Sequence, residues 1–183
     1  MPDKAVFLDR DGTIIEDVGY LNNPADIKFI PGSLEAIKLL NKAGYKIIIV
    51  TNQAGIARGL IREDMLQTID KTIQRLILNN GAYIEGIYYC PFHAEHGIYP
   101  YKQDSQLRKP NPGMLLKAAK DHNIDLAHSW MIGDKDGDIG AGKNAGTKTA
   151  FVKTGLHTVD RLANKPDIIA EDLMAAVKTI LGE

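Results

Sequence analysis

The sequence predicts an α/β protein built on a three-layer, doubly wound, Rossmann-like parallel sheet. Short apolar runs rich in β-branched residues alternate with longer stretches of helical period along the chain. Polar residues gather where several of these short runs end, which is where open parallel sheets bind their ligands. The 183 residues, 44% of them hydrophobic, are enough for one core and predict a single domain over 1–183.

The first predicted strand covers residues 4–8 and leads directly into two aspartates, Asp9 and Asp11, that flank one arginine. The Gly-Thr pair that follows lets the chain turn sharply while both carboxylates stay at the end of the strand. A helical pattern then begins after Ser33, its candidate cap, and ends at a glycine. The next apolar run, over 46–50, is rich in β-branched residues and predicts a second buried strand.

The middle of the chain contains a long stretch without a regular period. Residues 54–60 predict a loop or short turn, the apolar stripe over about 62–78 predicts a helix, and 87–89 predicts a third strand. The following segment, 90–107, has neither a helical nor a strand period and contains two prolines and a glycine. Because so long a loop is uncommon in a compact domain, we expect it to serve the site.

The last part of the chain returns to the alternation of helices and strands. The predicted elements are a helix over 114–122, a strand over 129–132, a short helix over 139–145, a strand over 148–152, an edge strand over 167–169 and a helix over 172–181.

Composition and charge argue against several classes of partner. The net charge is −1 and no basic run exceeds two residues, so the sequence has no electrostatic footprint for nucleic acid. No apolar stretch reaches transmembrane length, and the N-terminus lacks a signal-peptide pattern. The single cysteine, Cys90, cannot form an internal disulfide and suits a reducing compartment. We therefore expect a cytoplasmic monomer that acts on a small molecule, without nucleic-acid or membrane partners.

Asp9 and Asp11 are the strongest candidate functional residues. Two carboxylates one residue apart repel each other and favour a cation beside them. A calcium-binding loop is excluded, because Tyr20 stands at the twelfth position counted from Asp9, where such a loop requires glutamate. The remaining alternative is a polar turn without function, and candidate partners elsewhere in the chain argue against it.

Those candidate partners follow other strands or precede a helix, and the fold would bring them to one edge of the sheet. They are Thr51, Asn52 and Gln53 after the second strand, Arg108 and Lys109 before the helix over 114–122, and Asp134 and Asp138 after the fourth strand. Several carboxylates with oxygen partners favour Mg²⁺, and a lysine with a hydroxyl can hold phosphate oxygens. A carboxylate can then attack phosphorus and form an aspartyl-phosphate that water hydrolyses.

Four segments of the chain resemble, in order and spacing, the four motifs of the haloacid dehalogenase (HAD) superfamily. They are Asp9-x-Asp11-Gly-Thr, Thr51 after a strand, Lys109 before a helix, and Gly133-Asp134-x-x-x-Asp138. The resemblance implies that Asp9 is the nucleophile and a magnesium ligand. It also implies that Asp11 is the general acid and base, with its backbone carbonyl on the metal. Thr51 and Lys109 would bind the phosphoryl group, and Asp134 would complete the metal site.

A narrower resemblance covers nearly the whole chain. The runs LDRDGTII, DVGYL, TNQAGIARG, IYYCP, RKPNPGML and GDKDGD resemble the D-glycero-D-manno-heptose-1,7-bisphosphate 7-phosphatases, in a branch shared with histidinol-phosphate phosphatases. The branch lacks a separate cap domain. The resemblance implies cytoplasmic carbohydrate metabolism, the assembly of a heptose precursor for bacterial lipopolysaccharide. The substrate contacts that it implies are Asp17, Gly19, Tyr20, Asn52, Gln53, Arg108 and Lys135, with Arg108 and Lys135 suited to a second phosphate.

The long loop departs from this family. Its members usually hold a structural zinc through Cys-x-His and a later Cys-x-Cys, but here only Cys90 remains. Phe92 stands at the histidine position, and Ser105 and Leu107 stand at the later cysteine positions. Since a closed zinc site needs about four nitrogen or sulfur ligands, we expect the structural zinc to be absent.

Several functions remain as alternatives. Histidinol phosphate or another small phosphomonoester is the nearest alternative substrate. A phosphomutase would need a cap that excludes water, and a polynucleotide 3′-phosphatase would need a basic face. A non-catalytic phosphate-binding relative would have no use for both Asp9 and Asp11. The role of Asp138 is open, because it could orient Lys109, contact a metal-bound water, or only begin a helix.

Overall fold

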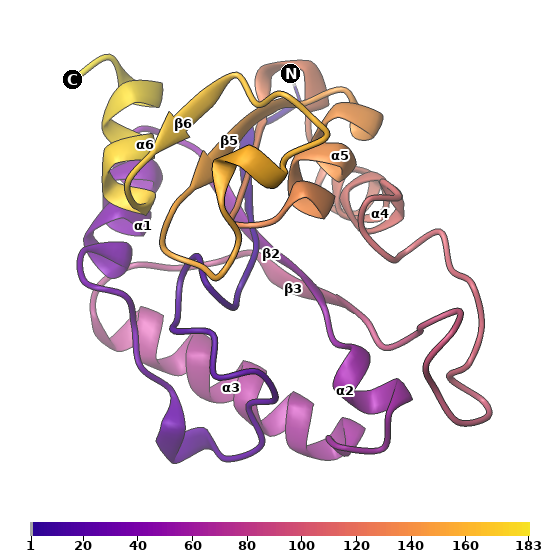
Figure 1. Ribbon diagram of the computed structural model, residues 1–183. Coiled ribbons are helices and arrows are strands. Elements are labelled where there is room, and N and C mark those ends of the chain that lie inside the picture. Colours follow the sequence, from indigo (N-terminus) through magenta and orange to yellow (C-terminus); the bar gives the residue numbers. More distant parts are fainter. Residues whose placement is uncertain (1) are drawn as a thin grey trace.

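Six parallel strands form one sheet, in the order β3-β2-β1-β4-β5-β6, in the computed structural model, which describes residues 2–183 (Figure 1). The strands are β1 Ala5–Leu8, β2 Lys46–Asn52, β3 Gly86–Cys90, β4 Trp130–Gly133, β5 Lys148–Val152 and β6 Ile168–Ala170. Every neighbouring pair is parallel, and helical crossovers connect the strands. This arrangement confirms the predicted doubly wound α/β fold.

Helices cover both faces of the sheet. They are α1 Ser33–Lys42, α2 Ala54–Ala57, α3 Glu63–Asn79, α4 Gly113–His122, α5 Asp136–Ala145 and α6 Leu173–Leu181, with short 3-10 turns at Pro24–Asp26, Leu126–His128 and Val159–Arg161. Helices α1, α3 and α6 contribute to one hydrophobic cluster, and α4 and α5 contribute to the other. Figure 1 shows α1 beside α6, and α4 beside α5 across the sheet from them.

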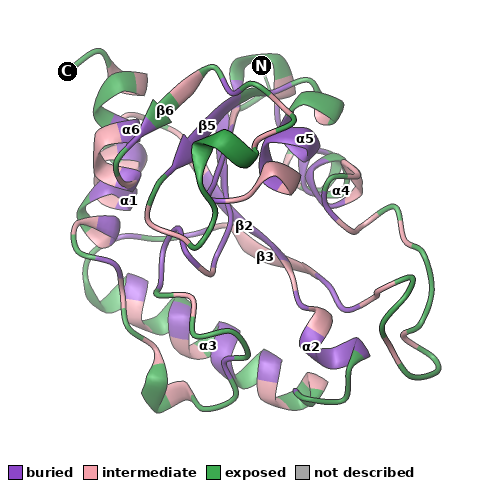
Figure 2. Cartoon of the chain, in the orientation of Figure 1, coloured by how far each residue is buried: buried purple, intermediate pink, exposed green. Residues whose placement is uncertain are grey.

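The apolar side chains of β1 pack on both faces of the sheet, because successive side chains of a strand point to opposite sides. Val6 and Leu8 pack in the cluster of α1, α3 and α6, whereas Ala5 and Phe7 pack in the cluster of α4 and α5. All four side chains are buried, and Figure 2 shows the neighbouring strand β2 largely in purple, the colour of buried residues. A fully buried strand therefore reads as a continuous apolar run, as the sequence analysis expected.

The order of the strands determines where a ligand can bind. Strand β1 pairs with β2 on one side and with β4 on the other, and the direction of winding reverses between β1 and β4. At such a reversal the connecting loops diverge and leave a crevice at the carboxyl ends of the strands. Asp9 follows β1 and Asp134 follows β4, so both aspartates lie at this crevice.

Local details differ from the predictions in three places. Ser33 is the first residue of α1 rather than its cap, because its hydroxyl donates to the carbonyl of Ile14 and the cap position belongs to Gly32. Helix α5 begins at Asp136, three residues before the predicted start at 139, because the Asp138 side chain accepts from the backbone N–H of Lys135. Strand β2 extends through Thr51 and Asn52, which were predicted to follow it, and the predicted loop or short turn after it contains one helical turn, α2.

The helices of residues 2–183 are too short or too polar to cross a membrane.

Candidate active site

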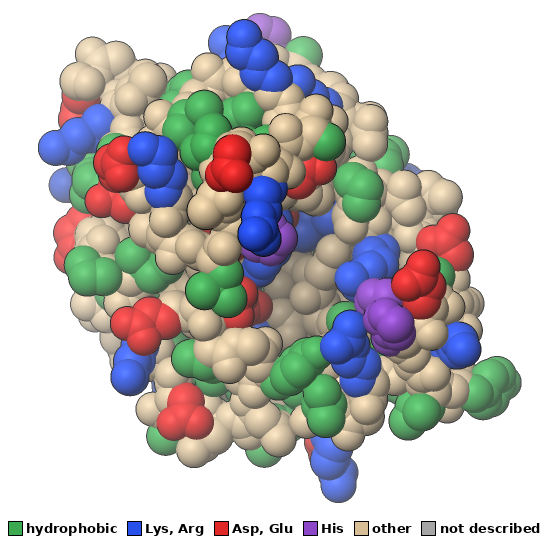
Figure 3. All heavy atoms as spheres, in the orientation of Figure 1, with side chains coloured by type: hydrophobic (Ala, Val, Ile, Leu, Met, Phe, Trp, Pro, Cys, Tyr) green, Lys and Arg blue, Asp and Glu red, His purple; other side chains and the backbone are tan. Residues whose placement is uncertain are grey.

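A cavity of about 300 Å³ opens at the carboxyl ends of the central strands, and Figure 3 shows the molecule hollowed on this face. Among the predicted residues, its wall contains Asp9, Asp11, Thr51, Asn52, Arg108, Lys109, Lys135 and Asp138. Gly137 also lines the cavity and was missed by the sequence analysis. The structure thus brings together residues from four separate segments of the chain, as parallel topology requires.

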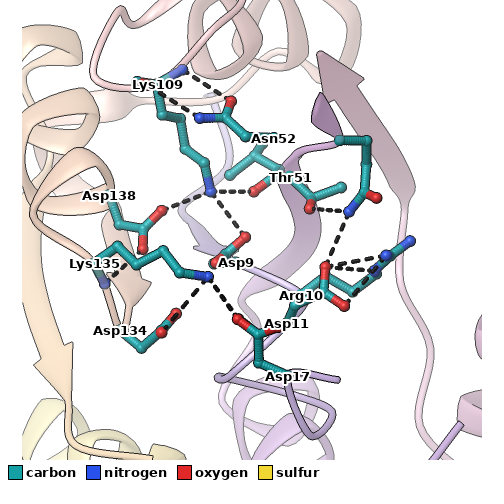
Figure 4. Close-up of polar contacts among 12 residues, drawn as sticks. Asp9, Arg10, Asp11, Asp17, Thr51, Asn52, Lys109, Asp134, Lys135 and Asp138 are labelled. Carbon is teal, nitrogen blue, oxygen red and sulfur yellow. Dashed lines mark hydrogen bonds and ion pairs between the residues drawn. The ribbon is translucent and has the colours of Figure 1, made fainter. Parts of the chain in front are cut away.

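Lys109 lies at the centre of this group, and its side chain is almost fully buried (Figure 4). Its Nζ donates to Oδ1 of Asp9 at 2.9 Å and to the carbonyl of Val50 at 2.7 Å, and it pairs with Oδ1 of Asp138 at 2.6 Å. Burial lowers the pKa of Lys109, but the carboxylates of Asp138 and Asp9 outweigh burial, so the net shift is upward. Lys109 is therefore a fixed cation beside Asp9.

Asp9 is ionised by its surroundings. Burial opposes its ionisation, but Lys109 and Lys135 outweigh burial and lower the pKa of Asp9. Its carboxylate is nearly inaccessible to solvent yet borders the cavity. An ionised carboxylate that is stripped of water and faces a pocket is suited to act as a nucleophile.

Asp138 is fully engaged by protein groups. Its Oδ1 holds Lys109, and its Oδ2 accepts from the backbone N–H of Lys135 at 3.0 Å. Burial and the nearby charge of Asp9 raise the pKa of Asp138 to about 6. Of the roles that the sequence left open for Asp138, this geometry favours orientation of Lys109, together with a cap on α5.

Asp134, unlike Asp138, is not held by hydrogen bonds from the protein. It is fully buried, and neither carboxylate oxygen has a hydrogen-bond partner among residues 2–183. Its nearest cation, Lys135 Nζ, is 3.7 Å from Oδ2, beyond hydrogen-bond distance. Burial and the charge of Asp9 raise the pKa of Asp134 to about 8. A buried carboxylate without a hydrogen-bond partner is costly, and a bound cation would remove that cost.

The backbone is shaped around Asp134. A Cβ added at Gly155 would lie 1.8 Å from Oδ2 of Asp134, and one added at Gly12 would lie 2.7 Å from it. Thr154 fixes this arrangement, because its hydroxyl donates to the carbonyl of Gly12 at 2.6 Å. Thr154 and Gly155 were not predicted from the sequence, since only the fold brings their loop against the loop after β1.

The oxygens available here match a hard divalent cation. Carboxylate oxygens of Asp9, Asp134 and Asp138 all lie within 4.8 Å of one another. The backbone carbonyl of Asp11 faces the same region, 3.5 Å from the Nζ of Lys135. Because Mg²⁺ prefers a few protein oxygens with water and phosphate as further ligands, the unpartnered Asp134 and its neighbours fit this ion.

The Asp11 side chain points away from this cluster, toward an arginine that the sequence analysis did not consider (Figure 4). Arg10 contacts both carboxylate oxygens of Asp11, with its Nε 3.1 Å and one terminal nitrogen 3.0 Å from Oδ2. Its other terminal nitrogen lies 3.1 Å from Oδ1 of Asp70 on α3. Gln53 also donates to Oδ2 of Asp11, at 2.9 Å, and to the hydroxyl of Thr51.

Asn52 fixes the backbone of Lys109 rather than pointing freely into the cavity. Its side-chain amide donates to the carbonyl of Lys109 at 3.0 Å and accepts from the Lys109 N–H at 3.1 Å. This pair of hydrogen bonds joins the end of β2 to the segment before α4, 57 residues later. Asn52 therefore positions the lysine that pairs with Asp9.

The remaining predicted residues lie at or outside the rim. Arg108 is half-buried and donates to the carbonyl of Phe92 at 3.2 Å. Burial and the charge of Arg58 lower the pKa of Arg108. Lys135 pairs with Asp17 at 3.1 Å, and burial is outweighed by Asp9, Asp134 and Asp17, so the pKa of Lys135 is raised.

Gly19 and Tyr20 are outside the cavity wall. The backbone N–H of Gly19 donates to Asp17, and the hydroxyl of Tyr20 accepts from Arg58 at 2.8 Å. Arg58 directly follows α2. Its contact with Tyr20 connects the loop after β1 to the segment after β2.

Apolar packing surrounds Cys90 in the long loop. Phe92 and Leu107 pack with the buried Cys90 against the cluster of α4 and α5. Glu63 of α3 accepts from Tyr89 at 2.7 Å and from Tyr101 at 2.8 Å, so one carboxylate holds both β3 and the loop. The loop that ends in Arg108 is thus held by packing and by Glu63.

Comparison with protein families supports these observations. A family model described as HAD-hydrolase-like matches residues 106–176, which include Lys109, Asp134 and Asp138. A D-glycero-beta-D-manno-heptose-1,7-bisphosphate 7-phosphatase of Pasteurella multocida is 43% identical, over 98% of this chain and 97% of the relative. The D-glycero-alpha-D-manno-heptose-1,7-bisphosphate 7-phosphatase of Burkholderia mallei is 44% identical, over 83% of this chain and 80% of the relative.

A solved structure has the same fold over its whole length. It is the D,D-heptose 1,7-bisphosphate phosphatase of B. bronchiseptica in complex with magnesium and phosphate. That protein is 32% identical to this chain, the comparison covers 98% of both chains, and the TM-score is 0.86.

Proposed function

Because the chain belongs to the heptose-1,7-bisphosphate 7-phosphatase family of HAD-like hydrolases, we propose that it removes the 7-phosphate of D-glycero-D-manno-heptose 1,7-bisphosphate. It is a phosphoric monoester hydrolase. The observation that carries the proposal is the buried set of Asp9, Lys109 and Asp138 beside the unpartnered Asp134. This set offers a nucleophile, a fixed cation and a metal ligand around one cavity.

Asp9 is the proposed nucleophile. Its ionised carboxylate attacks the phosphorus of the ester, the bond between phosphorus and the sugar oxygen breaks, and an aspartyl-phosphate forms. Water then attacks the same phosphorus, which releases inorganic phosphate and regenerates the Asp9 carboxylate. Lys109 remains beside Asp9 through both steps and offsets the charge on the phosphoryl oxygens.

Asp11 is the proposed proton carrier. It gives a proton to the departing sugar oxygen in the first step and takes one from the attacking water in the second. It lies two residues after Asp9, just beyond the end of β1, on the wall of the same cavity as Asp9.

We propose that Mg²⁺ is the cofactor and that Asp9, Asp134 and the carbonyl of Asp11 hold it. The support is the unpartnered state of Asp134 and the cluster of carboxylate oxygens around it. When bound, the ion neutralises charge on the phosphoryl oxygens and orients them toward Asp9. Asp138 is assigned to Lys109 instead, because both of its oxygens are already engaged by the lysine and by α5.

The substrate is proposed to lie across the cavity with its two phosphates at different depths. Thr51 and Lys109 bind the reacting phosphoryl group at the floor, and Arg108 and Lys135 attract the second phosphate near the rim. The other residues assigned to substrate binding, directly or through the walls they hold, are Asp17, Gly19, Tyr20, Asn52 and Gln53.

We further propose a single domain over 1–183 that acts as a cytoplasmic monomer without structural zinc. The apolar packing of Phe92 and Leu107 with Cys90 supports the last point, because zinc requires thiolate or imidazole ligands there. Metal analysis of the purified protein tests it. We expect no stoichiometric zinc, and one zinc per chain that resists dialysis would contradict the proposal.

The substrate is tested by phosphate release from both anomers of heptose 1,7-bisphosphate, fructose 1,6-bisphosphate, histidinol phosphate and a 3′-phosphorylated oligonucleotide. We expect magnesium-dependent release concentrated on a heptose anomer. Histidinol phosphate is the main alternative, and faster release from it would overturn the heptose assignment. Equal slow release from all esters would leave a phosphatase without this specificity.

A further inference from the structure

Arg10 is a large charged side chain inside the protein, with only 1% of its surface exposed. It forms ion pairs with two carboxylates, Asp11 at 3.0 Å and Asp70 at 3.1 Å. Among residues 2–183 these are its two ion-pair partners. Asp70 comes from the middle of α3, outside the wall of the cavity. The mechanism described so far uses neither Arg10 nor Asp70.

The pairing with Arg10 keeps the Asp11 carboxylate away from the reacting group. One oxygen of Asp11 accepts from Arg10, and the other accepts from both Arg10 and Gln53. Figure 4 shows the carboxylate turned toward Arg10, on the side opposite to Asp134 and Lys135. In this withdrawn position, both oxygens of Asp11 are engaged by protein groups, so neither is free to serve a departing sugar oxygen. Asp11 must therefore leave Arg10 before it can act.

When Asp11 leaves, the charge of Arg10 stays behind in a place that water does not reach. An unpaired charge in such a place is strongly unfavourable. Asp70 is the partner that remains, since it contacts a different nitrogen of the guanidinium from those that hold Asp11. We propose that Asp70 is a positioning residue for this reaction: by neutralising Arg10, it allows the Asp11 carboxylate to move from the withdrawn position to the leaving oxygen.

This inference rests on the proposed function and makes a specific claim about the first chemical step. In that step Asp9 forms a bond to phosphorus and the bond between phosphorus and the ester oxygen breaks. Asp11, which takes a proton from water after it leaves Arg10, gives that proton to the ester oxygen. A sugar alkoxide is a poor leaving group and needs the proton, whereas p-nitrophenolate leaves without one. Loss of Asp70 must therefore slow hydrolysis of a sugar phosphate more than hydrolysis of p-nitrophenyl phosphate.

The test compares Asp70→Asn with Asp64→Asn on the same helix. Asp64 also pairs with an arginine, Arg62, but that pair is exposed to solvent. The quantity measured is kcat/KM for heptose 1,7-bisphosphate divided by kcat/KM for p-nitrophenyl phosphate, which reports the first step alone. We expect Asp70→Asn to lower this ratio at least about tenfold, and Asp64→Asn to leave it unchanged. Misfolding would lower kcat/KM for both substrates by the same factor, so it would leave the ratio unchanged.

A second variant tests the charge argument and does not depend on the stability of the first. Arg10→Gln combined with Asp70→Asn removes the buried cation together with its partner, so the ion pair no longer holds Asp11 in the withdrawn position and the hydrogen bond from Gln53 remains. The ratio is expected to return to near the wild-type value. An unchanged ratio in Asp70→Asn, or a ratio in the double variant as low as about a tenth of wild type, would overturn the inference. Failure of the proposed function is separate, because the wild-type enzyme would then release no phosphate from heptose 1,7-bisphosphate.

Discussion

Asp134 is buried without a hydrogen-bond partner for either oxygen among residues 2–183, with Lys135 3.7 Å away and the like charge of Asp9 close by. Folding stability alone gives no reason to keep a carboxylate in such a place. Gly12 and Gly155 leave room for its oxygens where any larger residue would collide with them. The environment of this one residue therefore indicates a site maintained for a cation at a cost in stability.

Replacing Asp134 by asparagine is expected to stabilise the metal-free protein while removing its response to magnesium. The amide carries no charge to bury, so the free energy of unfolding should rise by about 1 kcal/mol or more in EDTA. Thermal unfolding with and without Mg²⁺ measures both effects. Wild type should gain stability from the ion and the variant should not. A variant that is less stable than wild type in EDTA would contradict this account of Asp134.

The difference in the free energy of unfolding between wild type and Asp134→Asn should also depend on pH. Burial and Asp9 raise the pKa of Asp134 from its ordinary value of 3.8 to about 8, so the folded state holds a proton that the unfolded state has lost. The resulting destabilisation is complete above pH 8 and is relieved as the pH falls toward 4. The advantage of Asp134→Asn in EDTA should therefore shrink between pH 8 and pH 5, as denaturant titrations at each pH would measure. An advantage that grows over this range would contradict the shift.

We expect Asp138 to affect catalysis by holding Lys109 in place. Asp138→Asn weakens the 2.6 Å ion pair that holds the lysine, so kcat/KM should fall about 10- to 100-fold. Magnesium binding, followed by the thermal shift, should be retained. Asp136→Asn is the matched control, because Asp136 lies in the same turn of α5 but accepts hydrogen bonds from Asn164 rather than contacting Lys109. Loss of magnesium binding in Asp138→Asn would instead make Asp138 a metal ligand.

At the scale of elements, the sequence predicted which segments form helices and strands better than it predicted the residues at which each begins and ends. Strand β5 and helix α3 were predicted nearly to the residue, because their apolar patterns are uninterrupted and end at turn residues. The start of α5 was missed, since its first turn is rich in aspartate and glycine and depends on the Asp138 side chain as a cap. Ser33 was misassigned because its partner, the carbonyl of Ile14, lies in a loop 19 residues earlier.

The long loop before α4 is expected to position Arg108 through Glu63. Glu63→Ala removes the acceptor shared by Tyr89 and Tyr101, so the loop should loosen. KM for the bisphosphate should rise several-fold, by about 1 kcal/mol of binding free energy, with little change in kcat. Glu95→Ala is the control, because Glu95 is exposed in the same loop. Equal effects of both variants on KM would show that Glu63 does not position the substrate site.

At the scale of the whole molecule, the site depends on parallel topology. Lys109 contacts Asp9 from 100 residues later in the chain, and Lys135 contacts Asp17 from 118 residues later. The sequence predicted this convergence because polar residues follow successive strands, and such strand ends share one edge. It could not predict the rotamer of Asp11 or its coupling to Asp70, since nothing in the local pattern around residue 70 differs from an ordinary helix.

The contact between the loops after β5, β1 and β4 was also beyond sequence reasoning, and it makes a prediction of its own. Gly155→Ala would place a methyl group against Asp134, 1.8 Å from Oδ2 before any movement. We expect lower stability and loss of the magnesium-induced thermal shift. Gly86→Ala is the control, because its nearest neighbour, the ring of Tyr88, is at an ordinary 3.4 Å. A wild-type magnesium response in Gly155→Ala would contradict the close fit around Asp134.

The central claim is that Asp9 carries the phosphoryl group during turnover. It is tested most directly by acid quench of the enzyme during hydrolysis of ³²P-labelled heptose 1,7-bisphosphate, followed by mapping of the labelled residue. The account predicts a covalent label on Asp9 that requires magnesium and is absent from Asp9→Asn. Label on another residue, or continued phosphate release by Asp9→Asn, would contradict it.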